Sequence, residues 1–119
     1  MSVSNLKYAR TASLGAGEPG RPEPDLLIEG APEFMSWPLI ETQTMSGVWA
    51  ASPGHHRVMR GDDLIESFYI LEGEIELFEE GQAAPKRFGP GDLVVLEPGF
   101  RGSWKTISAM RKVYFTSKV

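Results

Sequence analysis

The chain contains no cysteine among its 119 residues. This absence excludes disulfide bonds, zinc sites with thiolate ligands and cysteine nucleophiles. The chain also lacks the run of about 20 apolar residues that a membrane-spanning helix needs. Met1–Gly17 has no apolar segment of the kind found at the centre of a signal peptide, so we expect a soluble, cytoplasmic protein.

Basic residues are too few for a nucleic-acid-binding protein. The chain has 12 Lys and Arg against 16 Asp and Glu, a net charge of −4 at pH 7. Binding to phosphates requires a basic surface, so we expect no nucleic-acid partner, and no membrane partner either. The charges are separated along the chain, since residues 66–80 carry six acids and no base, whereas residues 101–119 carry five bases and no acid. Opposite charges of this kind pair well between neighbouring strands.

No window of ten or more residues follows a helical period. Instead, 13 Gly and 9 Pro separate short apolar segments, several of which alternate between apolar and polar residues. This pattern is typical of an all-β domain, either a sandwich or a barrel. The length suits one such domain, and a hydrophobic content of 41% suffices for one core. The predicted strands cover residues 34–40, 45–51, 55–60, 66–71, 74–79, 93–96, 101–107 and 110–116.

The first third of the chain differs from the rest. Between Gly15 and Pro32, eight of eighteen residues are Gly or Pro, and the one apolar run is Leu26–Ile28. We therefore predict an extended N-terminal arm over residues 1–33, followed by a folded domain over residues 34–119. Such an arm is either free or laid across a partner subunit, and the sequence leaves both arrangements open.

Two blocks within the folded domain resemble the paired motifs of the cupin superfamily. The first block comprises Gly54, Arg60-Gly61-Asp62, Glu66 and Gly73. The second runs from Gly91-Asp92 through Pro98-Gly99 to Gly102. The spacing is close to that of the family, in which histidines occupy three of these positions. The resemblance implies a jelly-roll barrel.

The C-terminal segment resembles one group within the cupin superfamily. Phe100–Trp104 and Arg111–Tyr114 are similar to small single-domain cupins of the (S)-ureidoglycine aminohydrolase and ethanolamine-utilisation types, and the similarity extends over residues 45–116. Within the first motif we expect Gly73 in a hairpin turn, because glycine readily adopts positive φ. We expect Asp92 to accept a hydrogen bond from the backbone of its turn.

In metal-binding cupins, three histidines and one glutamate hold the ion. The resemblance places these positions at Arg60, Asp62, Glu66 and Gly102. Arginine is not a metal ligand and glycine has no side chain, so we expect the metal site to be lost and no cofactor to be held. Alternatively, strand alternation places His56 on the face of Arg60, and His56, Asp62 and Glu66 would form a rebuilt site for a divalent ion such as Mn²⁺.

The same residues support a second interpretation. Arg60, Asp62 and Glu66 either form an ion-pair cluster, or Arg60 leaves its guanidinium free for an anionic ligand, and the two arrangements are compatible. His55 and His56 face opposite ways along their strand, so they are not expected to bind one ion together. We expect one of them to be exposed and the other hydrogen-bonded inside, with an acid/base role for His56 as the alternative.

Two tryptophans and two residues near the C-terminus are the remaining candidates for the site. Trp49 and Trp104 are expected in the core, with a ligand platform as the alternative. Lys112 and Tyr114 share one strand face. Lys112 pairs with Glu66 if that face lines the barrel, and is a surface residue if the face meets solvent, which is the arrangement we expect.

The resulting prediction is a homodimeric cupin that binds a small polar or anionic molecule. Its candidate ligand-binding residues are Arg60, Asp62, Glu66, Trp104 and Lys112, and no catalytic set is identified. The alternative is a metal-dependent or acid/base enzyme on a small nitrogenous or carbonyl substrate, like ureidoglycine aminohydrolase. A third possibility is a structural or regulatory protein whose own side chains fill the pocket.

Overall fold

The computed structural model describes residues 3–119, so the first two residues of the predicted arm lie outside the described residues. The elements, in chain order, are β1 (Glu18–Gly20), the 3₁₀ helix η1 (Pro24–Leu26), β2 (Leu27–Gly30), β3 (Phe34–Glu41), β4 (Thr44–Ala51), β5 (Gly54–Met59), β6 (Leu64–Glu79), β7 (Lys86–Phe88), β8 (Leu93–Leu96) and β9 (Arg101–Lys118). Within residues 3–119, no helix is long and apolar enough to cross a membrane.

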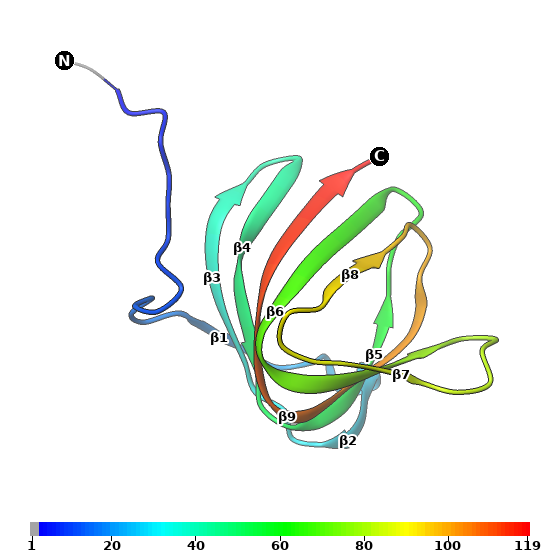
Figure 1. The fold of residues 1–119 in the computed structure, drawn as a ribbon. Helices are drawn as coiled ribbons and strands as arrows, with labels where there is room; N and C mark the ends of the chain where they lie inside the picture. Colours follow the sequence, from blue (N-terminus) through cyan, green and yellow to red (C-terminus); the bar gives the residue numbers. More distant parts are fainter. Residues whose placement is uncertain (1–2) are drawn as a thin grey trace.

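The strands form one antiparallel sheet that curls into a half-barrel (Figure 1). The long strand β9 lies at its centre. One edge of β9 pairs with β6 along almost its whole length, and the other edge pairs with β5 over its first half and β4 over its second. Strands β7 and β8 extend the sheet beyond β6, while β1 and β2 extend it beyond β3 and β5. The predicted all-β jelly roll is confirmed.

Strands β6 and β9 each join two predicted strands, and the hairpin turn predicted at Gly73 is wrong. Gly73 lies within β6, where the register against β9 shifts several times between Ile70 and Ile75. Its φ is +84°, and a side chain there would overlap the backbone oxygen of Ala109. Glycine therefore lets β6 bend closely against β9, and the two halves of the sheet fold over one another without interrupting the strand.

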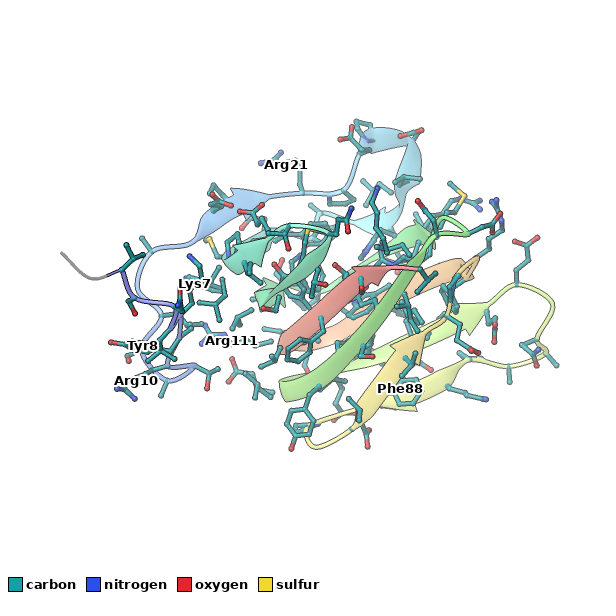
Figure 2. All side chains as sticks on the ribbon, turned by 90° about the horizontal axis from the view of Figure 1, so that it is seen from above. Lys7, Tyr8, Arg10, Arg21, Phe88 and Arg111 are labelled. Carbon is teal, nitrogen blue, oxygen red and sulfur yellow. The ribbon has the colours of Figure 1, made fainter. Side chains whose placement is uncertain are left out.

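Part of the predicted arm belongs to the sheet. β1 pairs with β3 and β2 pairs with β5, so residues 18–30 lie against their own barrel. The preceding segment extends away from the barrel (Figure 1). Two contacts hold it: Trp37 Nε1 donates to the Gly15 carbonyl (3.1 Å), and Arg111 donates to the Thr11 carbonyl (3.4 Å). In Figure 2, Lys7, Tyr8 and Arg10 of this segment lie on the side of Arg111.

The hydrophobic core lies on the concave side of the sheet, between its two halves. Phe68, Ile70 and Ile75 are fully buried, and Trp104 and Met110 are nearly so. These residues come from β6 and β9, whose side chains alternate between the concave and convex faces. The core therefore lies around the bend of β6 against β9.

Opposite charges meet across the sheet, as the charge separation predicts. Glu72 lies opposite Arg111, and Glu76 lies opposite Lys105, in the register of β6 and β9. The turn before β8 is also as predicted, because the Asp92 carboxylate accepts a hydrogen bond from the Gly89 amide (2.8 Å). Both features stabilise the fold without taking part in a site.

Candidate functional site

A cavity of about 390 Å³ opens on the concave side of the barrel. Its lining is apolar and aromatic around a small charged centre. The lining residues are Leu26, Met45, Trp49, His56, Arg57, Val58, Met59, Arg60, Leu64, Glu66, Trp104, Lys112, Tyr114 and Thr116. This volume and composition suit a small-molecule site.

The charged centre is assembled from three parts of the chain. Glu66 lies near the start of β6, Lys112 lies in the second half of β9, and Arg60 directly follows β5. Trp49 of β4 lies opposite Lys112, and Thr116 of β9 lies opposite Glu66. Because alternate residues of a strand share a face, this register places the side chains of the four strand residues on the concave side, and Arg60 lines the same cavity.

Glu66 is the acceptor at the centre of the site. Its side chain is 2% exposed, and its carboxylate accepts hydrogen bonds from Lys112 Nζ (2.7 Å) and from Arg60 Nη2. Burial acts to raise the pKa of Glu66, but the charges of Lys112 and Arg60 outweigh it and hold that pKa below its ordinary value. The carboxylate is therefore ionised and shared between two cations.

The preference for a solvent-facing Lys112 is wrong. Its side chain is 7% exposed, and the ammonium lies 4.6 Å from the ring centroids of Phe68 and Trp104 and 4.8 Å from that of Trp49. These distances are those of cation–π contacts. Burial lowers the pKa of Lys112, opposed by Glu66. The polar face of β9 thus lines the barrel, which is the arrangement in which Lys112 pairs with Glu66.

His55 and His56 lie on opposite faces, as strand alternation predicts. His55 is half-buried and its Nε2 is 2.7 Å from Ser103 Oγ. His56 is buried beside the cavity, between the rings of Phe34 and Trp104, and its Nδ1 has no hydrogen-bond partner. Burial, reinforced by the charge of Lys112, lowers the pKa of His56 to about 4. The expectation is therefore wrong, because neither histidine is exposed, the outer one makes the hydrogen bond, and the buried one has no partner.

Asp62 does not join the other predicted site residues. It is exposed in the turn after Arg60 and does not line the cavity. The alternative metal site of His56, Asp62 and Glu66 is therefore not assembled, and within residues 3–119 no three His, Asp or Glu side chains could hold a metal ion. At the fourth family position, a side chain on Gly102 would overlap the backbone oxygen of Phe78. The residues present do not fit a metal.

Several residues that line the cavity were not predicted from the sequence. Thr116 and Met45 carry no motif, and Leu26 belongs to η1 in the predicted arm. Only the register of β4 and β9 brings Met45 and Thr116 together. One sequence pattern could have identified Thr116. Lys112, Tyr114 and Thr116 are two residues apart along the strand, so their polar side chains share one face.

A larger groove of about 620 Å³ lies elsewhere, between β1, the start of β3 and the bend of β6 and β9. Its charged lining residues are Arg21, Glu33, Glu72 and Arg111. None of the predicted site residues lines it. The interior cavity, not this groove, therefore unites the candidate residues.

A curled antiparallel jelly roll with polar side chains converging inside the barrel defines a cupin. The chain belongs to the family of EutQ-like cupin domains, whose sequence pattern matches residues 39–114. This confirms the resemblance to the ethanolamine-utilisation type of cupin. No curated protein matches the chain.

Solved structures show the same fold. A protein of unknown function of the DUF861 family from Pseudomonas syringae pv. tomato shares 25% identity with a TM-score of 0.75, over 87% of this chain and 45% of its own. This chain thus spans less than half of that protein. A DUF861 family protein from Thermotoga maritima shares 31% identity with a TM-score of 0.51, over 56% of this chain and 73% of its own. The EutQ protein of Clostridium difficile is similar in fold, with 13% identity and a TM-score of 0.63 over 73% of this chain and 69% of its own.

Proposed function

We propose that this cupin binds a small anionic molecule in the interior cavity, and that it does so without a metal ion. The observation that carries the proposal is the charge of the cavity. Arg60 and Lys112 both pair with the single carboxylate of Glu66, so the charged centre keeps an excess of positive charge. An anion is the ligand that balances it.

Unpartnered polar atoms support the same conclusion. Arg60 Nε, His56 Nδ1 and Thr116 Oγ1 are buried without a hydrogen-bond partner, and all three residues line the cavity. Buried polar groups are nearly always hydrogen-bonded, so three exceptions around one cavity favour a polar ligand. The walls of Trp49 and Trp104 suit a flat or apolar body.

The size of the cavity supports this proposal over a purely structural role. A protein whose pocket is filled by its own side chains would leave no space, whereas the cavity measures about 390 Å³. Ligand binding to the folded state raises the melting temperature by an amount that depends on concentration over Kd. We therefore expect small monocarboxylates such as lactate to raise the melting temperature, and their methyl esters to have no effect.

Arg60→Gln is the decisive variant, because it removes the cation whose Nε is free. We expect it to weaken lactate binding at least tenfold in calorimetric titration. Arg101→Gln is the matched control, since Arg101 is exposed and does not line the cavity. Equal affinity of Arg60→Gln and Arg101→Gln for lactate, or no binding of lactate to the wild type, contradicts the proposal.

An acid/base enzyme is the second candidate, and His56 is the observation that favours it. With a pKa of about 4, its imidazole is neutral near pH 7. A neutral, unpartnered imidazole beside a ligand cavity is in the protonation state in which a general base accepts a proton. A metal-dependent reaction has no comparable support, since the residues present do not fit a metal.

A further inference from the structure

Lys112 has a combination of features that anion binding alone does not require. It is the one buried lysine of the described chain, residues 3–119. It lines the cavity, and its Nζ donates to a carboxylate at 2.7 Å. A lysine amine becomes a nucleophile toward carbonyl groups when burial favours its neutral form and a neighbouring base accepts its proton.

We propose that Lys112 forms a reversible imine with the carbonyl group of a small oxo acid bound in this cavity. The inference rests on the proposed function, because the oxo acid is held as an anion. Arg60 and Lys112 donate to the two oxygens of the same carboxylate, so the two cations are only a few ångströms apart. A molecule whose carboxylate and carbonyl are adjacent can therefore meet Arg60 with one group and Lys112 with the other.

Glu66 is the proton carrier for this step. The Lys112 ammonium transfers one proton to Glu66 Oε2, and the neutral amine adds to the carbonyl carbon to form a carbinolamine. Its nitrogen gives a second proton to the former carbonyl oxygen. Glu66 then returns the first proton to that hydroxyl group, the C–O bond breaks and water leaves. A nitrogen–carbon bond replaces a carbon–oxygen bond, the two lost protons are in the water, and nothing is oxidised or reduced.

The surroundings of Lys112 agree with such a role. Burial among Phe68, Trp104 and Trp49 lowers the pKa of Lys112, as does the charge of Arg60. The same rings exclude bulk water from the amine, which protects an imine from hydrolysis. The remaining lysines, Lys7, Lys86, Lys105 and Lys118, are not buried and serve as internal controls.

Reductive trapping tests the proposal on the full chain. The protein is incubated with pyruvate and sodium cyanoborohydride at neutral pH, which converts an imine into a stable carboxyethyl amine, and the modified lysine is located by peptide mass spectrometry. We expect Lys112 to be modified at least tenfold faster than Lys105, with a rate that saturates as pyruvate fills the cavity. Lactate, which has a hydroxyl group in place of the keto group of pyruvate, cannot form an imine but should compete. Arg60→Gln should slow trapping at Lys112 at least tenfold and leave Lys105 unaffected.

Two outcomes overturn the proposal: no modification at Lys112, or modification no faster than at Lys105 and without saturation. The failure of the imine is distinguishable from the failure of anion binding. If lactate raises the melting temperature but pyruvate is not trapped at Lys112, the cavity binds anions and only the imine is wrong. If lactate does not bind either, the proposed function itself is wrong.

Discussion

His56 couples the stability of the fold to pH. In the folded protein its pKa is about 4, whereas its ordinary value is 6.5, so between these values the unfolded chain binds a proton that the folded chain does not. Stability must therefore fall as the pH falls through this window. A difference of this size corresponds to about 3 kcal/mol in the free energy of unfolding.

The prediction is checked by urea unfolding at pH 7 and pH 4.5. We expect His56→Gln to remove most of the loss that the wild type shows between these values, because glutamine does not titrate. His55→Gln is the comparison variant: burial lowers the pKa of His55 as well, but this side chain is only half-buried, so its substitution should remove a smaller part of the loss. The readout is the difference between two pH values, so it does not depend on the baseline stability of either variant. Parallel pH profiles for wild type and His56→Gln refute the assignment.

Individual residues differ in how far the sequence predicts them. The ion pair of Arg60 and Glu66 follows from motif spacing, because both positions flank the one turn that joins the consecutive strands β5 and β6. The place of Lys112 does not follow, because a register shift reverses which side of a strand faces inward. The register of β6 against β9 shifts between Ile70 and Ile75, and the facing part of β9 directly precedes Lys112. These shifts depend on contacts between segments that are distant in the sequence. No sequence pattern near Lys112 indicates where these register shifts occur.

At the scale of elements, the bend of β6 depends on Gly73. We expect Gly73→Ala to destabilise the protein by at least about 3 kcal/mol, because alanine adds the cost of positive φ to an overlap with β9. Gly81→Ala is the matched control: its φ is +87°, but no atom lies within 4 Å of the added methyl group. That variant should lose only about 1 kcal/mol. Similar losses in the two variants, measured by urea unfolding, would show that the close approach of β9 costs nothing.

Elements with a strong alternating pattern were predictable, and those without it were not. The strands β3, β4, β5 and β8 lie within about two residues of their predicted positions. Strands β1, β2 and β7 were missed because they are three or four residues long and rich in Gly, Pro or charge. Their strand conformation comes from pairing with neighbours, since propensity alone does not specify so short a segment.

For the molecule as a whole, the sheet leaves part of its convex face uncovered. Four large apolar side chains are exposed there: Tyr69, Leu93, Val95 and Phe115. They are neighbours in the register, because Tyr69 lies opposite Leu93, and Ser67 lies opposite both Val95 and Phe115. A contiguous apolar surface of this kind favours association, and a two-fold dimer lets the patch cover itself in the other copy.

We therefore expect the chain to be a homodimer, with a molar mass in light scattering of about twice 13.1 kDa. Substituting Leu93→Glu together with Phe115→Glu should yield monomers, because the dimer would then bury four like charges. Met59→Glu is the matched control: Met59 is 55% exposed, similar to Phe115 at 54%, but lies at the end of β5, away from the patch. This variant should remain dimeric. A monomeric wild type refutes the dimer. A monomeric Met59→Glu would move the interface to the end of β5, where a second subunit would also border the ligand cavity that Met59 lines.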